Sequence, residues 1–176
     1  MTHHQAPAVD EIIQDWPQTA RESAQTVLDK YGPPDEATQH MLAWHGNGPW
    51  KWTVITDQET PHHFPTPHID VLEQAIDYKV PVDRYSDLAA FDGSVIVERT
   101  RGEISARCEG EEANYLAINL ANDIVTRTMT VDQARQRYAE VMQTMTEGGS
   151  DPYIERLVFD PPKDDTRDPD QKILDI

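Results

Sequence analysis

The segment PHHFPTPHID, from Pro61 to Asp70, holds three histidines and one carboxylate within ten residues. Imidazole nitrogens and a carboxylate oxygen are good ligands for zinc or iron, and two histidines with one acid leave open positions for water or a substrate. His63, His68 and Asp70 supply this set, and His45 is a candidate for a further ligand from elsewhere in the chain. The pattern therefore predicts a metal site.

A stiff connection into a helix explains the same segment without a metal. Proline-rich chain extends by about 3.1 Å per residue, so His63 and His68 lie about 15 Å apart unless the segment bends. The following sequence, TPHIDVLEQAIDYKVP, predicts a helix with Thr66 as its N-cap and an apolar face. That face consists of Ile69, Leu72 and Ile76. In such a helix His68 and Asp70 are two positions apart and do not share a face.

Three arginines form a second candidate site, on the predicted hairpin SVIVERTRGEISARC. Arg99, Arg101 and Arg107 are a positive island in an acidic protein, and guanidinium groups suit carboxylate or phosphate ligands. The alternative is that they pair with glutamates of the same hairpin. The same pattern places Cys108 on the apolar side of the hairpin, where it is interpreted as a small buried residue.

Three tryptophans form a third candidate, on the predicted hairpin HMLAWHGNGPWKWTVIT. Trp44 precedes the turn, and Trp50 and Trp52 follow it, with Trp50, Trp52 and Val54 expected on one face of the returning strand. Large aromatic residues are common in half-exposed sheets, where they cover a core. The functional alternative is the aromatic wall of a binding pocket.

The remaining elements are helices with clear apolar periodicity. WPQTARESAQTVLDKYG begins with proline in its first turn and ends at Gly32, and EEANYLAINLANDIVTR is the most apolar helix and is expected at the centre of the fold. Thr130 and Gln133 form a capping box that starts a further helix. Two hairpins and about four helices predict an α+β fold of two layers, with an antiparallel sheet packed against the helices.

Length and composition restrict the function further. The chain has 176 residues and a formal net charge of −17, which repels phosphate backbones and anionic lipids, so neither nucleic acid nor a membrane is an expected partner. Salt adaptation or high solubility explains such a surface. One cysteine excludes an intramolecular disulfide, and no secretory signal or long apolar run is present, which predicts a soluble cytoplasmic protein. We expect a disordered arm (1–14), one domain (15–160) and an acidic disordered tail (161–176).

A resemblance rests on KYGPPDEAT followed by Trp44. Over residues 17–54 the chain is similar to small domains of bacterial envelope lipoproteins, in which a helix ends in Tyr-Gly-x-Pro and a tryptophan-bearing hairpin follows. It lacks the lipid-attachment cysteine of those proteins near its start. The region from GPWK through ARCEGEEANYLAINLANDIV resembles uncharacterised bacterial proteins without known activity. The resemblance implies no functional residues.

Two functions follow from these patterns. The first is a soluble binding or protein-interaction module for an unknown protein or small-molecule partner, with the tryptophan hairpin and the His-Pro segment at its recognition surface. The second is a metal-dependent enzyme with a His/Asp site around residues 62–70 and zinc or iron as its cofactor. Familiar loops for phosphate, calcium or an activated serine are absent from the sequence, so the reaction is not specified.

Overall fold

The computed structural model describes residues 8–175 and contains a six-stranded sheet with the order β1-β2-β3-β4-β6-β5. All neighbouring strands are antiparallel. The strands are β1 (Glu36–Thr38), β2 (Met41–His45), β3 (Trp52–His62), β4 (His68–Asp77), β5 (Val95–Glu98) and β6 (Glu103–Cys108). The helices are α1 (Val9–Ile13), α2 (Gln18–Tyr31), the short 3-10 turn η1 (Val82–Arg84), α3 (Tyr85–Phe91), α4 (Glu111–Val125), α5 (Val131–Thr146) and α6 (Pro152–Glu155).

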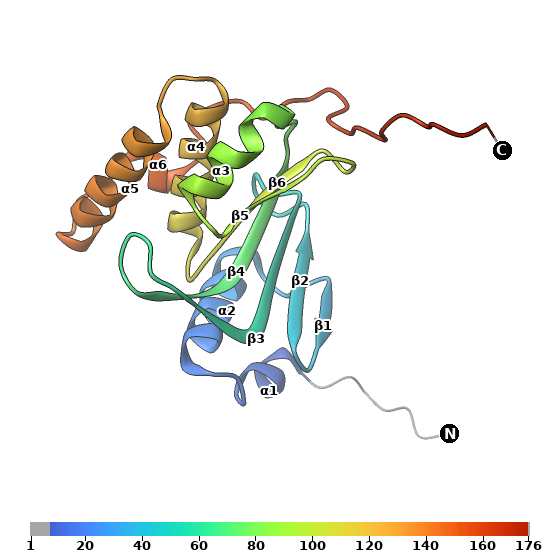
Figure 1. Cartoon of the computed structure of the whole chain (residues 1–176). Helices are drawn as coiled ribbons and strands as arrows, with labels where there is room; N and C mark the ends of the chain where they lie inside the picture. The colour runs from blue at the N-terminus through green and yellow to red at the C-terminus, as the bar shows by residue number, and fades with distance from the viewer. Residues whose placement is uncertain (1–7, 176) are drawn as a thin grey trace.

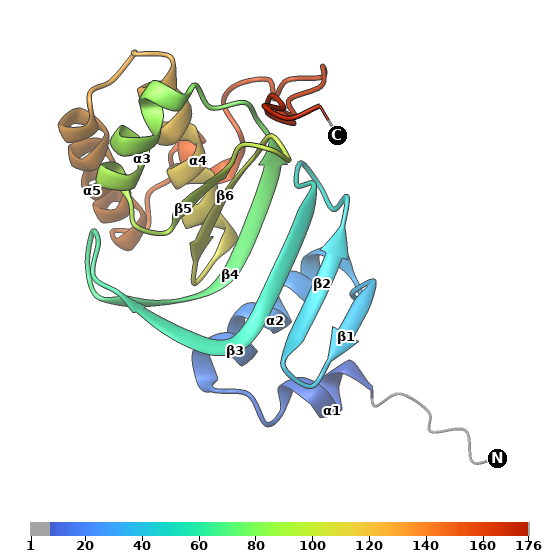
Figure 2. The same cartoon turned by 45° about the vertical axis from the view of Figure 1, so that its right-hand side comes forward.

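The helices bury one face of the sheet in two neighbouring clusters. Figures 1 and 2 show α2 and α4 behind the strands. Helix α2 packs with Leu42, Trp44 and Ile55 of the β1–β4 half. Helices α3, α4 and α5 pack with the β4, β6 and β5 half, and the residues of α4 that were expected to form its apolar stripe are all buried: Leu116, Ala117, Leu120, Ala121 and Ile124.

The α+β class with an antiparallel sheet is confirmed, and both predicted hairpins form, but the described residues contain six strands and six α-helices instead of two hairpins and about four helices. Strand β2 pairs with β3, and β5 pairs with β6 with Val95 opposite Ala106 and Val97 opposite Ile104. Gly102 has a φ of 65° in the β5–β6 turn, as expected of a residue without a Cβ. The sheet has additional members, since β1 extends one edge and β4 joins the two hairpins.

The predicted helix after Thr66 is wrong, because residues 68–77 form the central strand β4 between β3 and β6. In this strand the residues beside the helix-facing Leu72 and Ile76 are buried as well, so apolar residues occupy adjacent positions instead of alternating ones. Four residues are buried in this way: Val71, Leu72, Ala75 and Ile76. Their spacing also fits one face of a helix, and this ambiguity produced the error.

The ends of the chain differ from the sequence prediction. Residues 1–7 of the predicted arm lie outside the described residues, whereas Val9–Ile13 forms α1 and buries Ile12 and Ile13 against α2. Residues 161–175 form no helix or strand, but Thr166 is buried and its hydroxyl donates to the Gly102 carbonyl at 2.8 Å. Among the described helices, none has the length and apolar character that crossing a bilayer requires.

The predicted capping box at the start of α5 is confirmed. The Gln133 backbone N–H donates to Thr130 Oγ1 at 3.2 Å, and the Thr130 backbone N–H donates to Gln133 Oε1 at 2.9 Å. We expect Thr130→Ala to lower the free energy of unfolding by about 1 kcal/mol, because the substitution removes one half of this exchange. Thr144→Ala, an exposed position within the same helix, should change it by less than about 0.5 kcal/mol. Urea denaturation of both variants tests this; equal losses would contradict it.

Candidate metal centre

His62 and His68 face each other at the loop end of the β3–β4 hairpin. They are directly paired residues in the register of the two strands, and their ring centroids are 4.8 Å apart. Asp70 follows His68 by two positions on β4, and residues two apart in a strand point to the same side of the sheet. The hairpin therefore places two imidazoles and one carboxylate at a single point.

The side chains of these three residues are close and largely removed from solvent. His68 Nε2 lies 3.1 Å from Asp70 Oδ1, and His62 Nδ1 lies 3.4 Å from Asp70 Oδ2. The exposed fractions of the side chains are 16% for His62, 11% for His68 and 0% for Asp70. One ligand atom from each residue can be chosen so that all lie within 4.8 Å of one another.

The other polar atom of His68 and of Asp70 is held by a hydrogen bond, and that of His62 faces a carboxylate. His68 Nδ1 donates to the Thr66 carbonyl at 2.8 Å, which requires the proton on Nδ1. His62 Nε2 lies 3.6 Å from Asp92 Oδ1, and the Ser94 hydroxyl donates to Asp70 Oδ2. Metal-binding histidines are commonly oriented by such an acceptor on their second nitrogen.

Within the described part of the chain, the inward atoms of the three residues are buried and have no hydrogen-bond partner. They are His62 Nδ1, His68 Nε2 and Asp70 Oδ1. The separations of 3.1 and 3.4 Å reflect charge attraction without good hydrogen-bond alignment. Buried polar atoms are rarely left in this condition, and a site for an ion is one explanation for three of them together.

The ionisation of the cluster follows from these contacts. Asp70, the largest influence, and the neighbouring Cys108 thiol raise the pKa of His68 to about 11. Burial opposes ionisation of Asp70 most strongly, but His68 and Ser94 outweigh it, so the pKa of Asp70 is lowered. Burial raises the pKa of Asp92. Without a metal, His68 and Asp70 therefore form an ion pair, and a metal would take the place of the proton on His68 Nε2.

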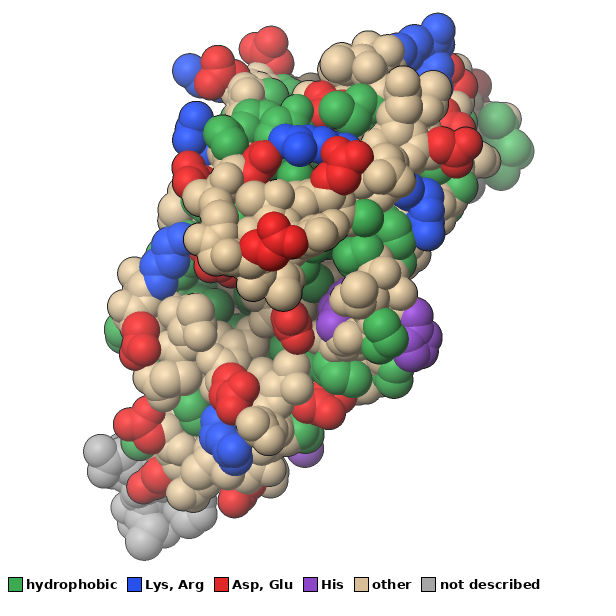
Figure 3. All heavy atoms as spheres, turned by 90° about the vertical axis from the view of Figure 1, so that its left-hand side faces the viewer, with side chains coloured by type: hydrophobic (Ala, Val, Ile, Leu, Met, Phe, Trp, Pro, Cys, Tyr) green, Lys and Arg blue, Asp and Glu red, His purple; other side chains and the backbone are tan. Residues whose placement is uncertain are grey.

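A cavity of about 270 Å³ borders the cluster at His68. The β3–β4 loop, the start of α4 and one side of α5 line it, with Cys108, Tyr138, Met142 and Met145 among the lining residues. Figure 3 looks onto the side of the molecule that carries the β3–β4 loop and shows histidine side chains at the surface beside apolar ones. The cavity is large enough for a small molecule next to His68.

The β3–β4 loop is fastened to α5 through Phe64. Its ring lies 5.0 Å from the Tyr138 ring, centroid to centroid, and the Arg135 guanidinium carbon lies 3.8 Å above it. Arg135 is held in turn by the Phe91 carbonyl, to which it donates at 2.5 Å. These contacts fix the loop that joins His62 to His68, and thereby the distance between the two imidazoles.

The structure brings together two of the four residues predicted as metal ligands. His68 and Asp70 belong to the cluster, whereas His63 is exposed in the loop. His45 is also exposed, and its Nε2 lies 2.9 Å from Glu36 Oε1, on the first hairpin. His62 takes the position expected for His63, because strand pairing places it opposite His68. No sequence pattern pointed to Asp92 and Ser94.

The three tryptophans do not line one surface. Trp44 is buried against α2 and donates to the Gly32 carbonyl at 3.0 Å. Trp50 is buried at 1% exposure on the other core cluster and stacks on Tyr115, with centroids 4.9 Å apart. Trp52 is half-buried on the opposite face of the sheet, so the expectation that it shares a face with Trp50 is wrong.

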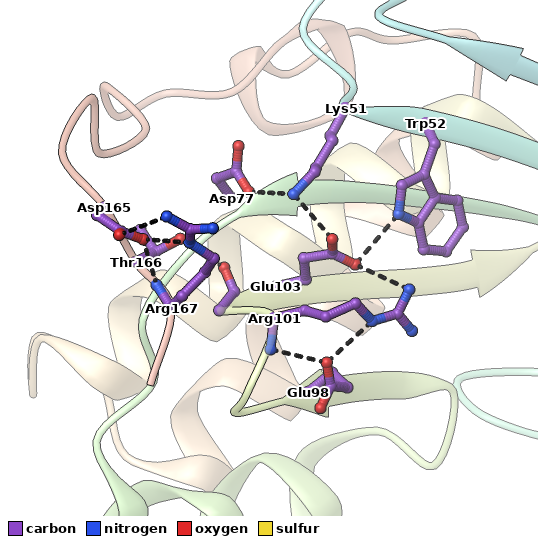
Figure 4. A network of polar contacts seen from close by, with 10 residues as sticks. Lys51, Trp52, Asp77, Glu98, Arg101, Glu103, Asp165, Thr166 and Arg167 are labelled. Carbon is purple, nitrogen blue, oxygen red and sulfur yellow. Dashed lines mark hydrogen bonds and ion pairs between the residues drawn. The ribbon is translucent and has the colours of Figure 1, made fainter. Parts of the chain in front are cut away.

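The three arginines of the second hairpin have different partners and do not form one site. Arg101 donates to Glu98 Oε2 at 2.9 Å and lies near Glu103, which accepts from the Trp52 indole at 3.2 Å; Figure 4 shows this network. Arg99 binds the C-terminal segment through Asp168 at 3.1 Å and Asp170. Among the arginine–carboxylate pairs of the described residues, only that of Arg107 involves the histidine cluster. Arg107 Nε lies 4.0 Å from Asp70 Oδ2.

Comparison with known proteins adds no assignment to this geometry. Neither a protein-family model, nor a curated protein, nor a solved structure matches the chain.

Proposed function

We propose that this protein binds one divalent transition metal ion through His62, His68 and Asp70. The observation that supports the proposal is the convergence of three buried ligand atoms without hydrogen-bond partners among the described residues. Thr66 and Ser94 hold the second polar atoms of His68 and Asp70, and Asp92 lies 3.6 Å from that of His62. The ion pair between His68 and Asp70 leaves these inward atoms without an aligned hydrogen bond. A metal ion would satisfy all three at once.

The donor set favours zinc or iron(II). Zinc takes imidazole nitrogen and carboxylate oxygen at roughly 2.0–2.2 Å, which puts tetrahedral ligand atoms roughly 3.3 Å apart. The His68 Nε2–Asp70 Oδ1 separation of 3.1 Å is close to that value, and all three ligand atoms lie within 4.8 Å of one another. Two histidines and one carboxylate also form the set used by many iron(II) sites. Calcium and magnesium prefer oxygen ligands and fit poorly.

Three protein ligands leave at least one position on the metal for water or a substrate. Catalytic zinc sites have this composition, because the open position holds a water molecule whose pKa the metal lowers. The cavity borders His68, so a small molecule held in it would lie next to this ligand. The metal site, its open position and the adjacent cavity together favour a metal-dependent enzyme.

Elemental analysis of the untagged full chain, purified without chelator, tests the metal site. About one zinc or iron per chain is expected, and His62→Ala should lose it, since the substitution removes one of three ligands. His63→Ala is the matched control, because His63 is the adjacent histidine in the chain and lies exposed outside the cluster. Full metal content in the His62 variant, or loss in the His63 variant, would contradict the assignment.

An interaction module is the second candidate, and the sheet face opposite α2 and α4 favours it. That face carries a shallow hollow lined by Trp52, Val54 and Ile96, and Ile96 is 38% exposed. If the protein contains no metal and takes up none on reconstitution, the interaction module becomes the favoured function. That result would also leave the residues of the β3–β4 hairpin as a purely structural ion cluster.

A further inference from the structure

Arg107 stands out among the arginines of the second hairpin because its buried nitrogen has no acceptor. It lies on β6 opposite Glu73 of β4, and its side chain is 35% exposed. The Nε atom is buried, however, and among the described residues it has no hydrogen-bond partner. Its closest carboxylate oxygen is Asp70 Oδ2, at 4.0 Å, which is beyond hydrogen-bond distance.

Pairing with Asp70 does not account for this arrangement. Asp70 Oδ2 already accepts from the Ser94 hydroxyl and lies 3.4 Å from His62 Nδ1. A guanidinium group has five N–H donors in a planar fork and is matched by a carboxylate or a phosphate with two oxygens side by side. Arg99 and Arg101, on the same hairpin, contact carboxylate oxygens at hydrogen-bond distance, whereas among the described residues Arg107 Nε has no such acceptor.

We propose that Arg107 and the metal together bind an oxyanion, a carboxylate or a phosphate ester of a small substrate. This inference rests on the proposed metal site, and it names the class of ligand that the site takes. One oxygen of the anion would occupy the open position of the metal, and another would accept from Arg107.

Because the chain is strongly acidic, an anion needs both the metal ion and Arg107 in order to bind. A protein with a formal net charge of −17 repels free anions over most of its surface. A divalent ion beside a guanidinium whose Nε has no hydrogen-bond acceptor among the described residues makes the local charge more positive, in a partly buried place where charges are weakly screened. An anion would therefore be bound here only when both are present.

The test uses the full chain loaded with cobalt(II), whose visible absorption changes when a ligand enters the open position. Acetate and methyl phosphate are the probes, and the concentration that gives half of the spectral change is compared among variants. Arg107→Gln should raise that concentration about tenfold to a hundredfold, because it removes charge-assisted hydrogen bonds. Arg101→Gln, which alters a paired arginine on the same hairpin, should change it less than about twofold.

The outcomes separate this inference from the metal site on which it rests. If cobalt binds but neither probe changes the spectrum, or if Arg107→Gln binds the probes as the unmodified chain does, the oxyanion site is refuted and the metal site stands. If Arg107→Gln lowers the affinity for cobalt but not the affinity for the probes, Arg107 is only a counter-charge for Asp70, and this result also refutes the oxyanion site. If no cobalt binds, both proposals fail. The probe that saturates at the lower concentration identifies the carboxylate or the phosphate ester as the ligand.

Discussion

Replacing Glu111 with alanine is expected to lower the free energy of unfolding by about 3–5 kcal/mol. The Glu111 carboxylate lies at the start of α4, is 8% exposed, and forms an ion pair with Lys30. It accepts hydrogen bonds from three further donors: Tyr31 Oη at 2.6 Å, Trp50 Nε1 at 2.6 Å and Gln74 Nε2 at 3.1 Å. The substitution would leave the buried indole and amide donors without an acceptor, which costs more than the bonds themselves contribute.

Glu112→Ala provides the matched control, since Glu112 is the next residue of the same helical turn and is exposed. It should change the free energy of unfolding by less than about 1 kcal/mol, which covers the loss of a favourable charge at the helix N-terminus. Urea denaturation at neutral pH measures both variants. Comparable losses would show that the first turn of α4, and not the buried network, is the source of the stability.

The Glu111 contribution should also depend on pH. Burial, the largest single influence, opposes ionisation, but Lys30, Tyr31 and Trp50 outweigh it and hold the pKa of Glu111 below its ordinary value of 4.5. A carboxylate with a lowered pKa stabilises the folded state fully above its unfolded-state pKa, and this stabilisation is lost as the pH falls through the folded-state pKa. The difference in stability between the unmodified chain and Glu111→Ala should therefore shrink as the pH is lowered below 4.5.

Helices α2, α4 and α5 could be predicted from the sequence because their signals are local, whereas the short helices α1, α3 and α6 were not predicted. Helix α2 begins after Pro17 and ends at Gly32, and α5 begins at the Thr130 capping box. Each signal depends on residues within one turn of the helix end, so no knowledge of the rest of the fold is needed. The same holds for the two hairpins, whose turns contain Gly46, Gly48 and Gly102 at positive φ.

Strand β4 could not be predicted because its pattern depends on residues far away in the chain. Leu72 pairs with Ile55 on one side and Cys108 on the other, and it packs with α2 residues. The buried side of this strand carries the polar residues Asp70 and Gln74 beside Leu72 and Ile76, so the sequence lacks the apolar–polar alternation of a half-exposed strand. Its apolar residues Ile69, Leu72 and Ile76 are spaced three and four positions apart, which fits one face of a helix equally well.

That single error also accounts for the differences at the candidate site. In a helix His68 and Asp70 point to different sides, whereas in a strand residues two apart point to the same side. A strand at 68–77 requires a hairpin with β3, and the hairpin brings His62 opposite His68. The separation of about 15 Å predicted for an extended segment between His63 and His68 does not arise, because the segment turns back.

Two residues of the site, Asp92 and Ser94, could not have been identified in this way. They lie between α3 and β5, more than twenty positions after Asp70, in a segment without a recognisable motif. Their role depends on the pairing of β5 with β6 and of β6 with β4, which carries Ser94 to the Asp70 carboxylate. Contacts that need two successive strand pairings are not encoded in local spacing.

Asp70→Asn is expected to weaken zinc binding at least about a hundredfold. Zinc sites in small proteins provide about 10–16 kcal/mol in total, so one ligand of three accounts for roughly 3 kcal/mol or more. An amide oxygen in the same place is neutral and is a poorer ligand for the ion. Asp57→Asn is the matched control, since Asp57 lies on β3 and pairs with another histidine, His40, at 2.7 Å near the surface.

Asp92→Asn, measured in the same titration, distinguishes a metal ligand from a residue that only orients one. Asp92 lies 3.6 Å from His62 Nε2, on the side of the ring that faces away from the proposed metal, so it should act by orienting His62. Loss of such an outer partner costs about tenfold to a hundredfold in metal affinity, less than loss of a ligand. Isothermal titration with zinc should therefore rank Asp70→Asn weakest, Asp92→Asn next and Asp57→Asn equal to the unmodified chain. A reversed order of the first two would make Asp92 the ligand and Asp70 its support, because the carboxylate that contacts the ion contributes more to binding than the one that holds the imidazole in place.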